Sequence, residues 1–152
     1  MPAALRPEIR HQTGRLHASD VAANYQQLGI AAQVEPFIED MAGAYAWADL
    51  VLCRAGALTI AELAAAGVGA ILVPLPHAID DHQTANARWL TDRRAGVLLR
   101  QEEMSPETLA QQLTELAAQP QELLAWARAA RALAKPDAAA QVVQCCLEVA
   151  HA

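Results

Sequence analysis

The sequence has 152 residues, a length of about one domain, and its 54% of apolar residues predicts a folded chain rather than a disordered tail. The formal net charge of −6, with arginines spread singly among acidic residues, argues against nucleic acid as a partner. The longest apolar stretch, residues 63–76, is interrupted by glycine and proline and falls short of the roughly 20 residues that a membrane-spanning helix needs.

Along the chain, short apolar runs alternate with longer segments of helical period, which is typical of a parallel sheet with crossover helices. We therefore predict an α/β fold in a single domain over residues 1–152. The predicted strands cover residues 8–13, 33–38, 49–53, 70–73 and 96–99. Helices are predicted over residues 19–28, 41–48 and 59–66, and from Asp80 or Asp81 through Leu90. Three more begin at Ser105-Pro106, at Pro120 and at a cap on Asp137.

Individual residues place some of these elements. Ser19-Asp20 is expected to cap the first helix and Gly29 to stop it. Pro36 cannot donate to a sheet ladder, so the strand 33–38 is expected at an edge. The continuous apolar run of residues 49–53 predicts a central strand buried on both faces.

The turn after this central strand is the first candidate binding site. Ligands of open α/β sheets bind at the carboxyl ends of the strands, and here Arg54-Ala55-Gly56 leads directly into a helix. Free main-chain N–H groups of Ala57, Leu58 and Thr59, together with the helix dipole, are suited to a diphosphate. Gly56 would let phosphate oxygens approach the main chain; the alternative is that it merely turns the chain.

Glu62 has two possible roles. Thr59-Ile60-Ala61-Glu62 matches a capping box, in which Thr59 caps the helix and Glu62 reaches back to it. The functional alternative is that the carboxylate accepts hydrogen bonds from both hydroxyls of a ribose.

The polar segment after the strand 70–73 is the second candidate site. Gln83 and Asn86 lie three apart on one helical face and can hydrogen-bond the hydroxyls of a sugar, although an ordinary exposed first turn would look the same. A metal site is a further alternative, because imidazole and carboxylate side chains are close together in this segment, at His77, Asp80, Asp81 and His82. No fixed ligand spacing supports it.

Three segments and several single residues together resemble the C-terminal domain of the MurG family of glycosyltransferases. They are residues 36–41, 44–51 and 53–62, followed by Val73-Pro74, His77, Gln83 and Asn86. The resemblance covers nearly the whole chain. It implies the Rossmann-like donor half of a GT-B enzyme that is inverting and metal-independent, needs no cofactor, and adds N-acetylglucosamine from UDP to lipid-linked muramyl-pentapeptide.

The resemblance also implies roles for single residues. The main chain of Ile38 would meet the uracil, with Met41 nearby. Ala57, Leu58 and Thr59 would hold the diphosphate, Glu62 the ribose, and Gln83 with Asn86 the sugar.

Parts of the family pattern are missing from this sequence. The domain that carries the acceptor site and the catalytic base is absent, as are the first strand and the Gly-rich loop of the donor domain. We therefore expect unpaired edges on the strands 8–13 and 49–53, through which the chain could self-associate, and no transferase activity from the chain alone. A non-catalytic fragment that binds no nucleotide is the competing hypothesis. We expect a cytoplasmic chain with reduced cysteines, and in the family a peripheral position on the inner membrane.

Overall fold

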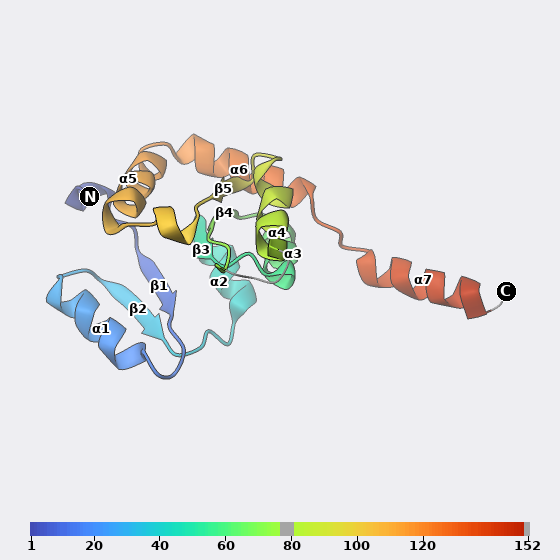
Figure 1. Cartoon of the computed structure of the whole chain (residues 1–152), viewed down its shortest axis with the longest axis horizontal. Helices are drawn as coiled ribbons and strands as arrows, with labels where there is room; N and C mark the ends of the chain where they lie inside the picture. Colours follow the sequence, from blue (N-terminus) through green and yellow to red (C-terminus); the bar gives the residue numbers. More distant parts are fainter. Residues whose placement is uncertain (77–80, 151–152) are drawn as a thin grey trace. The chain divides into compact units, whose positions relative to one another are not determined.

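The computed structural model describes residues 1–76 and 81–150, which belong to two compact units (Figure 1). The first unit contains Met1–Trp47 and Ser105–Pro120, and the second contains Ala48–Met104 and Gln121–Ala152. Parallel strands flanked by helices occur in both, which confirms the predicted α/β class.

In the first unit, β1 (Ile9–Gln12) pairs in parallel with β2 (Ala32–Glu35). The connection between them is the helix α1 (Ala18–Gln27), which lies along the two strands in Figure 1. The edge position predicted for the second strand is confirmed, and Pro36 follows the strand instead of lying within it. The unit also contains η1 (Ala3–Leu5), α2 (Met41–Trp47) and α5 (Pro106–Ala117).

The helix caps of this unit agree only in part with the sequence predictions. At α5, the Ser105 side chain accepts a hydrogen bond from the Thr108 N–H at 3.1 Å, which confirms the predicted cap. At α1 the prediction was wrong: the N-cap is His17, and Asp20 lies inside the first turn, where its charge favours the helix dipole instead.

In the second unit, three parallel strands are arranged in the order β3 (Leu50–Cys53), β4 (Gly69–Leu72) and β5 (Gly96–Leu98). The helices α3 (Ala57–Ala66) and α4 (His82–Thr91) connect them and lie side by side (Figure 1). After β5 come η3 (Gln101–Glu103), α6 (Pro120–Ala132) and α7 (Ala138–Ala150). The predicted βαβ unit is thus confirmed.

The prediction that residues 49–53 form a central strand is wrong. Among the described strands, β3 pairs with β4 alone and stands at one edge of its sheet, where 46% of Leu52 is exposed. The central strand is β4, whose four residues are all buried. The unpaired edges expected at β1 and β3 agree with these strand orders.

Close packing in the second unit depends on two glycines in the sheet. A Cβ on Gly69 would lie 2.7 Å from the Trp126 Cβ, so the absence of a side chain lets α6 lie directly against β4. A Cβ on Gly96 would collide with the Ala70 carbonyl of the neighbouring strand. The core around these contacts contains the fully buried side chains of Leu63, Ile71, Leu72 and Leu90.

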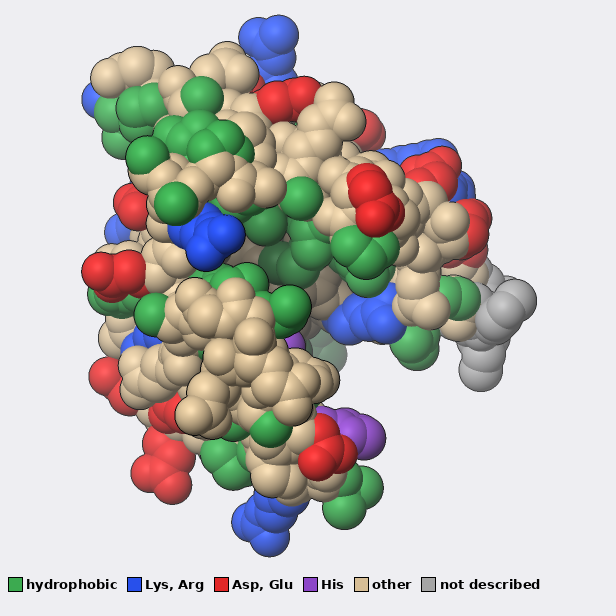
Figure 2. Space-filling view, turned by 90° about the vertical axis from the view of Figure 1, so that its left-hand side faces the viewer, with side chains coloured by type: hydrophobic (Ala, Val, Ile, Leu, Met, Phe, Trp, Pro, Cys, Tyr) green, Lys and Arg blue, Asp and Glu red, His purple; other side chains and the backbone are tan. Residues whose placement is uncertain are grey.

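The surface carries charges of both signs. On the face drawn in Figure 2, acidic and basic side chains are interspersed and neither sign gathers in a large patch. Within the described ranges, no helix combines the length and apolar character that crossing a bilayer requires.

Candidate functional site

The turn that leaves β3 brings a helix N-terminus to the carboxyl edge of the three-stranded sheet. The strand ends at Cys53, and α3 begins at Ala57 with Gly56 as its N-cap. Because all three strands run parallel, the segments after β3, β4 and β5 meet at this same edge. The edge is therefore where the sequence placed its candidate site.

The predicted capping box is wrong. The helix α3 begins two residues before Thr59, and no side chain caps it. Thr59 is the third helical residue and Glu62 lies in the second turn, so the two do not occupy the N-cap and N3 positions of a capping box. The ribose role of Glu62 stays a prediction.

The first N–H groups of α3 point at the carboxyl edge without a partner from the helix. The Ile60 N–H is the first to bond within the helix, to the Gly56 carbonyl at 3.0 Å. The N–H groups of Ala57, Leu58 and Thr59 precede it, and the N-cap Gly56 gives them no side-chain bond, so with respect to the described residues they are available to water or a ligand. Ala57 is exposed, and 80% of Leu58 is exposed, so the main chain here is open to solvent.

Gly56 does not have the conformation that would make glycine necessary for the turn. Its φ of −65° and ψ of 147° suit any residue. A Cβ built there would meet only the Thr59 Oγ1, at an ordinary 3.5 Å. Within the described residues, neither backbone conformation nor packing requires a glycine at position 56, which weakens the alternative that Gly56 merely turns the chain.

Both candidate sugar-binding amides also hold the loops of this edge. The Gln83 Oε1 accepts a hydrogen bond from the Leu75 N–H at 2.9 Å, and the Asn86 Nδ2 donates to the Ala55 carbonyl at 3.0 Å. An N–H can only donate and a carbonyl can only accept, so these partners fix which end of each amide faces the main chain. The Gln83 Nε2 donor and the Asn86 Oδ1 acceptor are the ends that remain for a ligand.

Arg54 is a residue that the sequence reasoning assigned no role. Its Nη1 lies 3.3 Å from the Val73 carbonyl oxygen and 3.2 Å from that of Pro74, and its Nη2 donates to the Gln101 Oε1 at 2.7 Å. The sequence did contain a signal for such a role: Arg54 directly follows the strand that ends at Cys53, at the carboxyl edge of the sheet.

Cys53, the last residue of β3, lies beside Glu62. Burial, and next to it the negative charge of Glu62, raise the pKa of the Cys53 thiol to about 11. The thiol therefore stays protonated at neutral pH and is not a nucleophile there.

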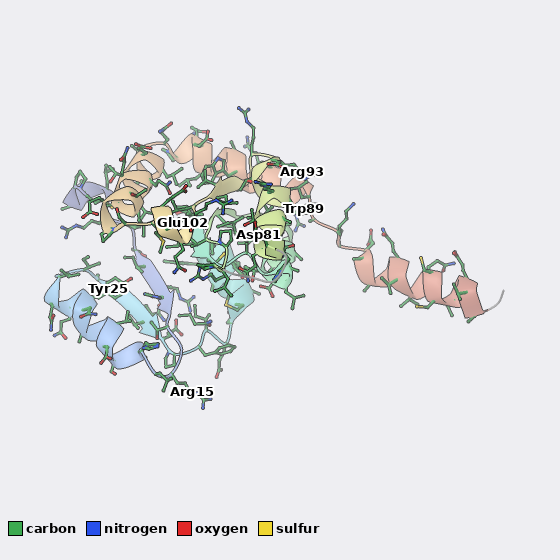
Figure 3. All side chains as sticks on the ribbon, viewed as in Figure 1. Arg15, Tyr25, Asp81, Trp89, Arg93 and Glu102 are labelled. Carbon is green, nitrogen blue, oxygen red and sulfur yellow. The ribbon has the colours of Figure 1, made fainter. Side chains whose placement is uncertain are left out.

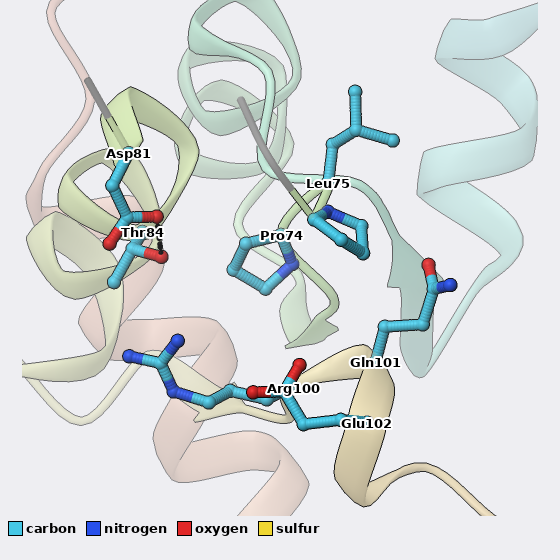
Figure 4. A pocket seen from close by; sticks show the side chains of 8 residues that line it. Pro74, Leu75, Asp81, Thr84, Arg100, Gln101 and Glu102 are labelled. Atoms are coloured by element: carbon cyan, nitrogen blue, oxygen red, sulfur yellow. Dashed lines mark hydrogen bonds between the residues drawn. The ribbon is translucent and has the colours of Figure 1, made fainter. Parts of the chain in front are cut away.

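A cavity of about 260 Å³ opens at the same edge, between the segments that follow β4 and β5 (Figure 4). Its lining residues are Pro74, Leu75, Pro76, Asp81, Thr84, Arg100, Gln101 and Glu102. Asp81 and Glu102 are also labelled in the wider view of Figure 3. Asp81 is the N-cap of α4, but its Oδ1 accepts from the Thr84 Oγ1 at 2.6 Å instead of capping a main-chain amide.

The metal alternative gains no support from the described residues, among which no group of three or more His, Cys, Asp or Glu side chains could hold an ion. His77 and Asp80, two members of the proposed cluster, lie outside the described residues.

The two residues expected to meet a uracil belong to the first unit. Ile38 is 7% exposed, and its N–H donates to the Gln12 Oε1 at 2.9 Å. Met41 is the first residue of α2 and is half-buried. The remaining expected site residues, Ala57, Leu58, Thr59, Glu62, Gln83 and Asn86, all belong to the second unit.

Comparisons with known proteins are consistent and cover most of the chain. The model of the glycosyltransferase family 28 C-terminal domain matches residues 3–142. The UDP-N-acetylglucosamine–N-acetylmuramyl-(pentapeptide) pyrophosphoryl-undecaprenol N-acetylglucosamine transferases of Stutzerimonas stutzeri (strain A1501) and Pseudomonas putida (strain W619) are each 58% identical over 151 residues. These alignments cover 99% of this chain and 42% of each relative, so the chain spans less than half of their length.

Solved structures agree with these relatives. The crystal structure of MurG from Acinetobacter baumannii matches with a TM-score of 0.84 and 48% identity, over 90% of this chain and 40% of that one. The spinosyn forosaminyltransferase SpnP matches with a TM-score of 0.52 at 14% identity, over 95% of this chain and 46% of that one, a likeness of fold alone.

Proposed function

The chain belongs to the glycosyltransferase family 28 C-terminal domains, and from this premise we propose that it binds the UDP-N-acetylglucosamine donor of a peptidoglycan transferase. In the complete enzyme the sugar would pass to the undecaprenyl-pyrophosphoryl muramyl-pentapeptide, as the names of the relatives describe. The observation that carries the proposal is the uncapped, solvent-open start of α3 at the carboxyl edge of the sheet.

The start of α3 suits a diphosphate. Ala57, Leu58 and Thr59 offer main-chain donors at the positive end of the helix dipole, and Gly56 leaves room above them. When the bond from sugar to diphosphate breaks, negative charge develops on the UDP leaving group. Donors already in place stabilise that charge without reorganisation and without a metal ion.

The remaining roles follow the chemistry of each group. The Glu62 carboxylate has the two acceptor oxygens that a pair of ribose hydroxyls needs. The Gln83 Nε2 donor and the Asn86 Oδ1 acceptor suit sugar hydroxyls, which both donate and accept. The Ile38 carbonyl, with Met41 nearby, would accept from the N–H of uracil, because the Ile38 N–H is bound to Gln12.

The acceptor site and the catalytic base are assigned to parts of the complete enzyme outside this chain. The chain itself would bind and orient the donor so that an acceptor hydroxyl attacks directly with inversion. In the complete enzyme we place it at the cytoplasmic face of the inner membrane, following the family resemblance.

Titration calorimetry with UDP tests the proposal. The wild-type chain is expected to bind UDP, and Glu62→Ala to lower the affinity about tenfold or more, because a charged acceptor of two hydrogen bonds is lost. Glu148→Ala on α7 is the matched control: it removes an exposed carboxylate that bonds only Gln144 among the described residues and should change nothing. Absence of heat from the wild-type chain would favour the competing hypothesis of a fragment that binds no nucleotide.

A further inference from the structure

Side-chain hydrogen bonds join three segments of the carboxyl edge into a closed ring. Arg54, at the start of the β3–α3 turn, bonds the carbonyls of Val73 and Pro74 after β4. The next residue of that segment, Leu75, donates to Gln83 on α4.

The ring closes through Asn86, which lies one turn further along α4. Its Nδ2 donates to the carbonyl of Ala55, the residue that follows Arg54 in the chain. Ala55 is completely buried. The β3–α3 turn is therefore bonded to the segment after β4 through Arg54 and to α4 through Ala55, directly before the start of α3. Each of the three segments is thereby tied to the other two.

Arginine has the geometry that this ring requires. Its planar guanidinium offers five donors in fixed directions, and here two of its nitrogens reach three acceptors on the segments after β4 and after β5. The Val73 and Pro74 carbonyls lie beyond the last residue of β4. A lysine ammonium carries its donors on one nitrogen, so it cannot reproduce the two separate nitrogens that reach the carbonyls and Gln101.

We propose that Arg54 is a positioning residue for donor binding: it holds the β3–α3 turn so that the N–H groups of Ala57, Leu58 and Thr59 converge on the diphosphate. This inference rests on the proposed function. Arg54 acts through the turn and does not itself touch the donor. The acceptors of its printed bonds are neutral oxygens, so its contribution depends on the directions of its N–H donors.

Conservative substitution distinguishes this positioning role from a direct attraction between the charge of Arg54 and the diphosphate. If Arg54 positions the turn, Arg54→Lys loses UDP affinity nearly as severely as Arg54→Gln, by about tenfold or more in each. The dependence of the residual affinity on ionic strength stays that of the wild type. If the charge itself attracts the diphosphate, Arg54→Lys keeps most of the affinity, and Arg54→Gln flattens the salt dependence.

The experiment measures UDP affinity by calorimetry at two salt concentrations, with the unfolding midpoint of each variant alongside. Gln101→Leu removes one exposed partner of Arg54 and is expected to weaken UDP binding by a few-fold, which keeps the test decisive if an Arg54 variant does not fold. Arg88→Lys, on the exposed surface of α4, is the matched control and should bind as the wild type does.

The outcomes divide clearly. Loss of affinity in Arg54→Lys with an unchanged unfolding midpoint supports the inference, and wild-type affinity in Arg54→Lys overturns the inference alone. If the Arg54 variants do not fold, Gln101→Leu decides instead: a few-fold loss of affinity supports the inference, and wild-type affinity overturns it. If the wild-type chain does not bind UDP at all, the proposed function fails, and the inference fails with it.

Discussion

At the scale of single residues, the orientation of the two amides on α4 yields a matched pair of substitutions. Asn86→Asp replaces the donor that faces the Ala55 carbonyl by an acceptor, and Gln83→Glu keeps an acceptor opposite the Leu75 N–H. We expect Asn86→Asp to lower the free energy of unfolding by about 1–3 kcal/mol, because the carbonyl of the buried Ala55 then faces a negative oxygen. Gln83→Glu should change it by less than about 1 kcal/mol. Urea denaturation of the two variants checks this, and equal losses would contradict the amide orientations.

The thiols provide a second prediction at this scale. At pH 8, a thiol reagent should label the exposed Cys145 and Cys146 rapidly and Cys53 only after unfolding, because burial and the Glu62 charge raise the pKa of Cys53 to about 11. Counting labelled thiols with and without urea measures this. Rapid labelling of all three in the native chain would contradict it.

The raised pKa of Cys53 also predicts how the stability of the fold changes with pH. The unfolded thiol loses its proton near its ordinary pKa of 9.0 and the folded one near 11, so folding favours the protonated form. The contribution of the protonated Cys53 thiol to the free energy of unfolding is complete below about pH 9 and is lost as the pH rises towards 11. Cys53→Ala should remove this part of the alkaline decline.

At the scale of the elements, substitutions at two glycines should distinguish effects on ligand binding from effects on stability. Gly56 precedes α3, and Gly69 lies against α6. A Cβ on Gly56 meets no close neighbour, whereas one on Gly69 meets Trp126 on α6. We expect Gly56→Ala to change the free energy of unfolding by less than about 1 kcal/mol and Gly69→Ala to lower it by about 2 kcal/mol or more.

The same pair should differ in ligand binding. Gly56→Ala is expected to weaken UDP binding about tenfold, because its methyl group occupies the space above the start of α3. Thermal unfolding and UDP titration of both variants give the comparison. A Gly56→Ala variant with wild-type affinity would show that the donor does not approach this turn closely.

The sequence predicted the existence and type of most elements, because apolar runs and helical periods depend on neighbours along the chain. Ser105 and Pro120 marked their helices correctly, since these signals are local. The start of α3 was missed because Thr59 and Glu62 imitate a capping box, and nothing in their spacing shows that the helix begins earlier. The apolar run of residues 49–53 wrongly predicted a central strand, because such a run reads the same whether one or two strands flank it. The open edge of β3 was expected only from the family resemblance.

The segments of the candidate site could be predicted from the sequence, but the bonds between them could not. The segments at the carboxyl edge were identified because parallel strands bring their ends together. The bonds that tie those segments, from Arg54 to Val73 and from Asn86 to Ala55, join residues far apart in the chain. No spacing rule predicts such bonds. The position of Arg54 after a strand was visible in the sequence, but the main-chain partners of Arg54 and of the two amides were not.

At the scale of the whole molecule, the open edge of β3 bears on association. Among the described strands, β3 (Leu50–Cys53) has a neighbour on one side only, and Leu52 in this strand is half-exposed. Such an edge can pair with another chain. We expect the chain to self-associate with rising concentration and Leu52→Lys to reduce this, because a charge on an edge strand disfavours pairing. Sedimentation of both forms measures it, and a wild-type chain that stays monomeric would contradict it.

The single domain expected over residues 1–152 stays a prediction that unfolding tests. One domain is expected to unfold in one cooperative transition, with a calorimetric enthalpy equal to the van't Hoff enthalpy. Two independent units would unfold in separate transitions.

The helix α7 buries none of its 13 residues. Helices of about this length are only marginally stable in water when nothing packs against them, so the helical structure of α7 depends on its own main-chain hydrogen bonds. Its amides should exchange with deuterated water far sooner than those of β4, and a gene shortened to stop at Asp137 should yield a protein that melts at the same temperature as the longer one.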